Sequence, residues 1–154
     1  GSGTPPEPTG IENTGSIATV TFGAAATWAK VLEFEQDIAV GNAEFGSMSW
    51  ITTPEVRGAW KALEKATNTA QFVWGSDNMV NGYNTYVSNQ VASDKVVFGN
   101  FSQLLIGSWG GSTVTVDPYS KAQTGQFVVT ISSFHDVAVR HPEAFSFSTD
   151  SGAQ

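Results

Sequence analysis

The chain has no cysteine, few positively charged residues and no long hydrophobic run. Without cysteine it forms neither disulfide bonds nor thiolate metal sites. No apolar segment approaches the roughly 18 residues of a membrane-spanning helix, and no charged-then-apolar leader is present, so we expect no membrane partner. Lysine and arginine total 7 against 14 acidic residues, a formal net charge of −7 at pH 7. This charge repels nucleic acid, so no sequence-specific nucleic acid partner is expected.

The composition is that of one folded domain with an uncharged polar surface. Hydrophobic residues make up 40% of the 154 residues and charged residues only 14%. A chain of this length can bury a sizeable core but is short for two domains. Much of its surface must therefore consist of serine, threonine, asparagine, glutamine and glycine.

Two helices are predicted in the first half of the chain. The first covers residues 24–42 and ends near Gly41. Its apolar face has helical spacing and consists of Trp28, Val31, Leu32 and Ile38. The second starts at Thr53, a hydroxyl cap ahead of Pro54, and continues to about Ala66. Its apolar stripe consists of Val56, Trp60 and Leu63.

Strands are predicted mainly in the second half. Those expected cover residues 45–51, 72–74, 83–88, 96–98, 113–117 and a longer segment, 126–140. Gly110 and Gly111 predict a hairpin turn between two strands. Because helices come early and strands late, the predicted fold class is α+β rather than a doubly wound sheet.

A hydrolase triad is the first catalytic hypothesis to weigh. Ser132, Ser133, His135 and Asp136 supply the three residue types within five positions. In a strand, however, His135 and Asp136 point to opposite faces, so the acid cannot orient the imidazole. His135 and His141 would also lie about 20 Å apart along an extended strand, too far to share a metal ion. We therefore predict no catalytic residue and no metal site.

Three further binding hypotheses also give way to structural interpretations. Gly107, Gly110 and Gly111 precede hydroxyl residues, but the lysine of a phosphate-binding loop is absent. The pairs Glu33 with Glu35 and Glu55 with Glu64 could suggest a glycosidase, yet acids on helices usually form a solvated face. The tryptophans that could stack on a sugar are Trp28, Trp50, Trp60, Trp74 and Trp109. Trp28 and Trp60 are better placed in the core, which leaves Trp109 as the plausible exposed anchor. No cofactor is expected.

Two stretches of the second half resemble the major capsid proteins of tailed phages of the Hong Kong 97 type. Residues 98–102, Phe-Gly-Asn-Phe-Ser, are similar to a glycine-aromatic strand of that family. The characteristic ending of the family is similar to Asp136, Val139, Pro142, Ala144 and Phe145 here. The opening segment and the Thr53-Pro54 helix start occur in the family's order, so the resemblance extends over nearly all of the chain. Residues 82–84 are Gly-Tyr-Asn where the family usually has Gly-Tyr-Pro, and no residue matches the cross-linking groups of some relatives.

The resemblance implies the C-terminal part of a capsid subunit, with a central mixed sheet flanked by two main helices. Residues 1–11 would be a linker from a missing spine helix, and 12–125 the axial domain. Residues 126–148 would be a strand returning to the peripheral domain, and 149–154 a C-terminal tail.

The function implied is that of a structural, non-enzymatic major head protein of a phage or prophage. It would self-assemble into the hexamers and pentamers of an icosahedral shell that encloses DNA. Copies of itself would be the main partners, with a scaffold, a head protease and a portal as further ones. Its location would be the virion capsid and, before assembly, the host bacterial cytoplasm. An encapsulin-type shell protein and a carbohydrate-binding module remain as alternatives.

Overall fold

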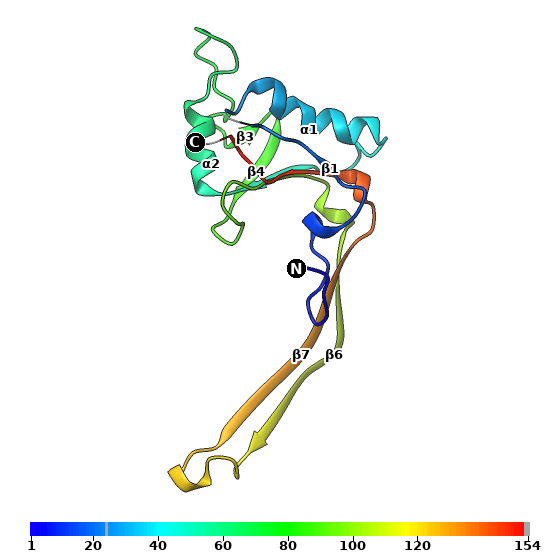
Figure 1. Cartoon of the computed structure of the whole chain (residues 1–154), viewed down its shortest axis with the longest axis vertical. Coiled ribbons are helices and arrows are strands. Elements are labelled where there is room, and N and C mark those ends of the chain that lie inside the picture. The colour runs from blue at the N-terminus through cyan, green and yellow to red at the C-terminus, as the bar shows by residue number, and fades with distance from the viewer. Residues whose placement is uncertain (24, 153–154) are drawn as a thin grey trace.

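The computed structural model describes residues 1–23 and 25–152, and it has two parts, an α/β core and a long β-hairpin (Figure 1). The core is built on a six-stranded mixed sheet with the strand order β1-β8-β5-β2-β4-β3. Its strands are β1 (Ala18–Thr19), β2 (Ser49–Thr52), β3 (Met79–Val80), β4 (Tyr83–Val87), β5 (Val96–Gly99) and β8 (Phe145–Ser148). The hairpin consists of β6 (Leu104–Asp117) and β7 (Val128–Val139). Short 3-10 turns cover Ile11–Asn13, Phe101–Gln103, Ala122–Thr124 and Pro142–Ala144.

Helix α1 (Trp28–Val40) begins later than expected and buries a different stripe. The side chain of Thr27 caps it by accepting a hydrogen bond from the backbone N–H of Lys30 at 3.4 Å. The predicted start, residue 24, lies outside the described residues, whereas the predicted end at Gly41 is confirmed. The buried side chains are Val31, Phe34 and Ile38. Leu32 was wrongly placed on the buried face and is 38% exposed, because the stripe with i, i+3, i+7 spacing is centred on Phe34.

Helix α2 (Pro54–Ala62) has the predicted Thr53 cap but ends about four residues early. Its buried residues are Val56 and Trp60. The helix stops because the next residues pair with a later segment. The carbonyl of Leu63 accepts a hydrogen bond from the N–H of Val73 at 2.9 Å. The predicted strand at 72–74 forms only isolated bridges, from Phe72 to Glu64 and from Trp74 to Val80 of β3.

Aromatic rings fill the space between the two helices and the sheet. The ring of Trp50 on β2 stacks on Phe98 of β5, with 4.2 Å between the centroids. Phe34 of α1 and Trp60 of α2 meet the same indole, with centroids 5.2 and 5.9 Å away. Both helices therefore pack on the face of the sheet that carries Trp50. The predicted α+β class, with a mixed central sheet and two main helices, is confirmed.

The last strand closes the core with a segment distant in sequence. β8 pairs antiparallel with β5 and parallel with β1, so Phe147 lies opposite both Val97 and Thr19. Residues 126–148, predicted as a single returning strand, are therefore two strands separated by a short turn at Pro142–Ala144. Proline explains the break, because it lacks the N–H that a continuing strand would donate.

Strands β6 and β7 pair with each other from Leu104↔Val139 to Asp117↔Val128 and extend away from the core (Figure 1). The prediction of a turn at Gly110 and Gly111 was wrong. These residues form a bulge inside β6, where the register shifts between Trp109 and Thr113. Both glycines have left-handed backbones, with φ of 68° and 56°, which suits a bulge as well as it suits a turn. The actual turn lies at residues 118–127.

Candidate assembly surfaces

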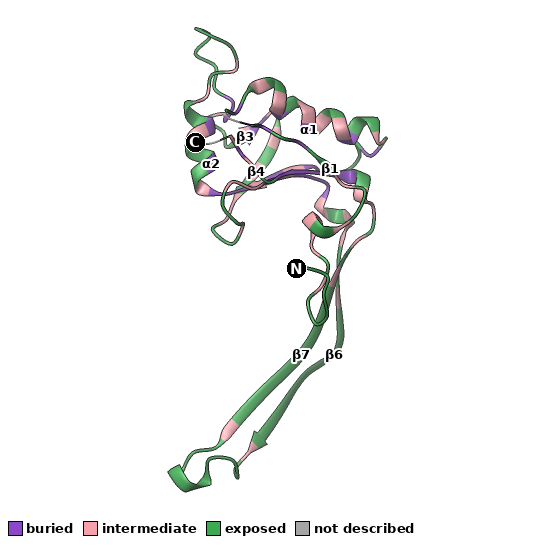
Figure 2. Ribbon diagram, viewed as in Figure 1, coloured by how far each residue is buried: buried purple, intermediate pink, exposed green. Residues whose placement is uncertain are grey.

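One face of the hairpin is an exposed aliphatic surface. Successive residues of a strand point to opposite faces, so alternate residues and their cross-strand partners share a face. On one face this gives the register pairs Ile106↔Val137, Val114↔Ile131 and Val116↔Val129. We call the six residues of these pairs the aliphatic face. The polar pair Ser108↔His135 lies on the same face, between Ile106 and Val114. Ile106 and Ile131 are 73% and 68% exposed, and only Val137 of the six is half-buried. Figure 2 shows most of the hairpin in the colour of exposed residues.

The opposite face of the hairpin is more polar towards its tip. It carries the register pairs Thr113↔Ser132 and Thr115↔Thr130, followed by Asp117. Nearer the core, Trp109 lies opposite Phe134, and both rings are exposed. A Cβ added to Gly107 would lie 3.0 Å from the Trp109 ring, so the indole folds back over this glycine. Trp109 is therefore exposed, as predicted, on the face opposite the aliphatic one.

The root of the hairpin is fixed to the core by Asn100. This side chain is buried, and its amide donates to the carbonyl of Phe45 at 2.8 Å. Its Oδ1 accepts from the N–H of Ser102 at 3.1 Å. On the other strand, the N–H of Arg140 donates to the carbonyl of Gln103 at 2.9 Å. A satisfied buried amide of this kind sets the direction in which the hairpin leaves the core.

The hairpin has the features of a surface that binds another polypeptide. Within the described part of the chain, β6 and β7 hydrogen-bond as strands only with each other, so each keeps one open edge. An isolated two-stranded ribbon is at best marginally stable in water. Groups of exposed apolar residues are typical of protein interaction sites. The arrangement therefore suits packing against other polypeptide, with open edges that could add a strand.

The residues of the hypothetical triad lie on this hairpin and do not converge. His135 pairs in register with Ser108, and Asp136 with Gly107, so the two side chains point to opposite faces. A carboxylate oxygen of Asp136 accepts from the backbone N–H of Val137 at 2.8 Å. Ser132 shares the face of Asp136, and Ser133 lies opposite the bulge.

The two histidines do not gather ligands around themselves. His141 has left the hairpin, and its Nδ1 lies 3.0 Å from the carboxylate of Glu143. Within residues 1–23 and 25–152, no three histidine, cysteine or acidic side chains lie together in a way that could hold a metal ion. No helix in these ranges is both long and apolar enough to span a membrane.

Three of the four glutamates considered as glycosidase pairs have separate structural partners. Glu33 pairs with Lys30 at 2.6 Å, whereas Glu35 accepts hydrogen bonds from Asn81 and from Tyr83. Burial, followed by the hydrogen bond to Glu35, raises the pKa of Tyr83 to about 12. Glu64 accepts from the backbone N–H of Asn68 at 3.0 Å. Glu33, Glu35 and Glu64 therefore each interact with a different group.

The tryptophans form no common platform. Trp50, Trp60 and Trp74 are buried in the core, as predicted for Trp60. Trp28 is half-buried at the core's edge, where the Nζ of Lys65 lies 4.4 Å from its ring centroid. Only Trp109 presents an exposed indole among the five. The aliphatic face, by contrast, was not identified from the sequence, although residues 128–139 carry the alternation that could have revealed it.

Comparison with known proteins identifies the family. Residues 1–150 match the sequence profile of the Phage capsid family. The chain is 32% identical over 153 residues to the major capsid protein of Halomonas phage phiHAP-1. This match covers 99% of the chain but only 25% of the relative's length. The chain therefore spans about a quarter of the length of this relative.

Solved capsid structures share the fold. The capsid of an empty GTA particle gives a TM-score of 0.72 at 20% identity, over 96% of this chain and 58% of the other. Mycobacterium phage Che8 gives 0.61 at 10% identity, over 86% and 53%. A virus-like particle from Pyrococcus furiosus gives 0.59 at 14% identity, over 90% and 58%. The chain belongs to the phage capsid family and has the Hong Kong 97-like capsid fold.

Proposed function

We propose that this chain is part of a major capsid subunit that self-assembles into the hexamers and pentamers of an icosahedral, DNA-enclosing shell. The observation that carries the proposal is the aliphatic face, an exposed apolar surface on a hairpin of a capsid-family chain. Subunit interfaces of the standard size bury about 800 Å² per partner, and shells multiply such contacts. The protein would be located in the virion capsid and, before assembly, in the bacterial cytoplasm.

The two parts of the molecule suggest how the subunit is divided. The α/β core is the candidate axial domain, with residues 1–11 as the linker that leads into it and 149–154 as the tail. β7, within residues 126–148, is the candidate strand that returns to the peripheral domain. Because β6 pairs with β7 along its whole length, β6 goes with it, and the boundary moves from residue 125 to the root of the hairpin near Asn100.

We propose that another segment of the full-length subunit packs on the aliphatic face. The longer relative carries such additional polypeptide outside the matched region. The relative from phage phiHAP-1 has three quarters of its length outside the match. Gly1 lines a groove together with Phe101, which lies just before β6, so a preceding segment would emerge near the root of the hairpin. Burial of these side chains would contribute about 25 cal/mol per Å² of apolar surface.

The other hypotheses receive less support. An enzymatic role lacks a converging triad, and a sugar-binding role lacks an aromatic platform. An encapsulin-type compartment shares the fold, but the relative at 32% identity is a phage protein. We propose a scaffold, a head protease and a portal as further partners of the full-length protein during shell assembly. The net charge of −7 is consistent with a capsid shell that binds the enclosed DNA only weakly.

Paired substitutions in the full-length protein test the proposal. Ile131→Asp places a charge on the aliphatic face, whereas the control Thr130→Asp places it on the opposite face of the same strand. We expect closed particles by negative-stain microscopy from the wild type and from Thr130→Asp, and none from Ile131→Asp. We expect monomers or small rings from the 154-residue chain alone. Closed shells from this chain alone, or a full-length protein that never assembles, would overturn the proposal.

A further inference from the structure

One exposed flank of α2 is basic, and no ion pair of its two cations is found within the described residues. Arg57 and Lys61 lie one turn apart on this flank, beside the buried stripe of Val56 and Trp60, while the exposed Glu55 lies on the other flank. They are two of the chain's 7 cations. The ion pairs found within residues 1–23 and 25–152 use Lys30, Lys95 and His141 instead. Like charges at this spacing repel each other, and an acidic partner would remove this repulsion.

The C-terminal end of α1 has the opposite character. A groove at this end is lined by the carboxylates of Asp37 and Glu143 and by the aliphatic side chains of Ile17 and Val40. The end of a helix carries partial negative charge and favours lysine or arginine, yet the last turn of α1 has none. Val40 is 75% exposed at the rim of the groove.

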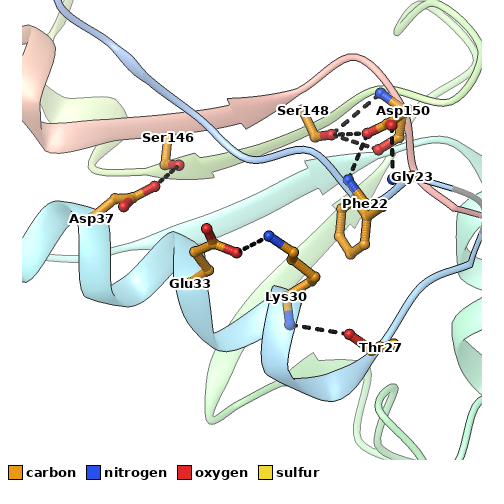
Figure 3. Close-up of polar contacts among 9 residues, drawn as sticks. All are labelled: Phe22, Gly23, Thr27, Lys30, Glu33, Asp37, Ser146, Ser148 and Asp150. Carbon is orange, nitrogen blue, oxygen red and sulfur yellow. Dashed lines mark hydrogen bonds and ion pairs between the residues drawn. The ribbon is translucent and has the colours of Figure 1, made fainter.

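The groups around this groove leave its charge largely uncompensated. Figure 3 shows the hydroxyl of Ser146 donating to Asp37, at 3.4 Å, while Lys30 turns to Glu33. Burial, more than any other cause, raises the pKa of Asp37. Glu143 faces only the imidazole of His141 among its described partners. A lysine or arginine side chain of another molecule would stabilise both carboxylates.

The two surfaces lie at opposite ends of the core. In Figure 1, α2 is at one end of the sheet, and the C-terminal end of α1 and residues 142–144 are at the other. The basic flank of one copy therefore cannot reach the acidic groove of the same copy. Contacts between two different surfaces of identical subunits are head to tail, and they generate a ring when the rotation closes.

We propose that Arg57 and Lys61 of one copy dock into the groove of Asp37, Val40 and Glu143 on a second copy, so that the cores join head to tail in a ring. The inference rests on the proposed shell function and deepens it by naming the contact within a capsomer. An arginine suits this groove, because its aliphatic stem packs on apolar side chains while its guanidinium binds carboxylates. Ile17 and Val40 supply the apolar wall.

Charge reversal in the full-length protein tests the contact. Arg57→Glu with Lys61→Glu, and separately Asp37→Lys with Glu143→Lys, should each reduce the yield of capsomers and shells at least tenfold in sizing chromatography. Combining all four substitutions should restore assembly, since the charges again match. Arg57→Lys, which keeps the charge, should assemble. Urea unfolding of each variant in the 154-residue chain checks that the fold is kept.

Disulfide bonds between introduced cysteines test the contact directly. The 154 residues contain no cysteine, so Lys61→Cys with Val40→Cys introduces two thiols on the surfaces proposed to meet. Oxidation should give a ladder of linked subunits on a non-reducing gel. The control, Lys61→Cys with Thr130→Cys, should not.

The outcomes separate this inference from the shell function. If the wild type builds shells and the reversed variants build them equally well, the contact is wrong while the shell function stands. If the wild type forms rings that depend on these charges but never shells, the contact stands and the shell function fails. If the wild type never self-associates, both are wrong.

Discussion

The core and the hairpin are both rich in β-structure, but they differ in what their strands contact. β6 and β7 have 14 and 12 residues, and neither contains a buried residue. β8 has four residues, all of which are buried. Both parts form strands, so the difference in burial comes from whether another layer of the protein covers the strand. The core strands are covered by other parts of this chain, whereas the hairpin strands are not.

The two parts also differ in how far apart in sequence their partners lie. The hairpin pairs strands joined by a turn of about ten residues, and such local pairing forms rapidly. In the core, Ala18 pairs with Ser146, so nearly the whole chain must be in place before the sheet closes. The core should accordingly unfold as one cooperative unit, and the hairpin should open locally.

The largest expected contrast is between two tryptophans. Trp60→Ala should reduce the free energy of unfolding by about 3–5 kcal/mol, because it removes a fully buried ring that contacts Phe22 and Trp50. Trp109→Ala should change it by less than about 1 kcal/mol, because the hairpin ring is 59% exposed. Urea unfolding followed by circular dichroism measures both.

Trp60→Phe is the matched control for this contrast. The Nε1 of Trp60 is the one buried side-chain nitrogen or oxygen without a hydrogen bond among the described residues. Phenylalanine would therefore lose volume but no hydrogen bond, and it should destabilise less than alanine. Equal losses from Trp60→Ala and Trp109→Ala would show that the core and the hairpin are not energetically distinct.

The sequence predicted the core better than the hairpin, for physical reasons. Helix caps and apolar periodicity are local, so Thr53 and the end of α1 at Gly41 could be located from a few residues. β8 has no local signal, since its pairing with β1 and β5 depends on residues far away in the chain. The bulge was mistaken for a turn because Gly110 and Gly111 carry the same backbone signal in both settings.

The candidate site was harder to predict than the fold. A capsid subunit functions through surfaces, and no set of reactive residues marks them. The aliphatic face depends on the pairing of Ile106 with Val137 and of Val114 with Ile131, and pairing between strands cannot be read from either strand alone. The groove at the end of α1 combines residues from segments that are more than 100 positions apart, such as Asp37 and Glu143.

A smaller contrast compares two glycines. A Cβ on Gly99 in β5 would lie 2.4 Å from the carbonyl oxygen of Ala144, so Gly99→Ala should cost about 1–3 kcal/mol through overpacking. Gly110 in the hairpin has open space around it but a φ of 68°, so Gly110→Ala should strain only the bulge. Gly15→Ala, which meets nothing within 4 Å, is the neutral control. A larger loss in global stability from Gly110→Ala would contradict the assignment of the hairpin as a local unit.

Tyrosines give a third contrast, at alkaline pH. The folded-state pKa of Tyr83 is raised to about 12, chiefly by burial, whereas an unfolded tyrosine ionises near about 10. The unfolded state therefore loses its proton first, so the stabilisation from Tyr83 is complete below about pH 10 and is lost as the pH rises towards about 12. Tyr83→Phe should cost about 1 kcal/mol at neutral pH and weaken this alkaline loss.

Near-ultraviolet absorbance against pH provides the measurement. The tyrosinate signal that titrates near pH 12 should vanish in Tyr83→Phe and persist in Tyr119→Phe, at the exposed tip of the hairpin. Persistence of the signal in Tyr83→Phe would assign it to another tyrosine and remove the alkaline prediction.

The smallest contrast compares two aspartates with nearly the same hydrogen bonds. Asp150 accepts from the N–H groups of Phe22 at 2.9 Å and Gly23 at 3.0 Å, which ties the end of the chain to the start of the core (Figure 3). Asp117 accepts from the N–H groups of Tyr119 and Ser120, at 2.8 and 3.1 Å, within the hairpin turn. The pKa of Asp150 is lowered mainly by Phe22, and that of Asp117 mainly by the Ser120 hydroxyl.

The consequence for stability should depend on what each aspartate connects. A lowered folded-state pKa stabilises the fold above the unfolded value of about 3.9, and this stabilisation is lost as the pH falls through the folded value. Asp150→Asn should therefore lower the free energy of unfolding at pH 7, by about 1 kcal/mol or less given its exposure, and flatten its dependence on acid pH. Asp117→Asn should leave the global midpoint unchanged at every pH, since its contacts span only three residues and break when the hairpin turn opens. Equal shifts for the two variants would mean that the hairpin unfolds together with the core, and the division of the molecule into two parts would fail.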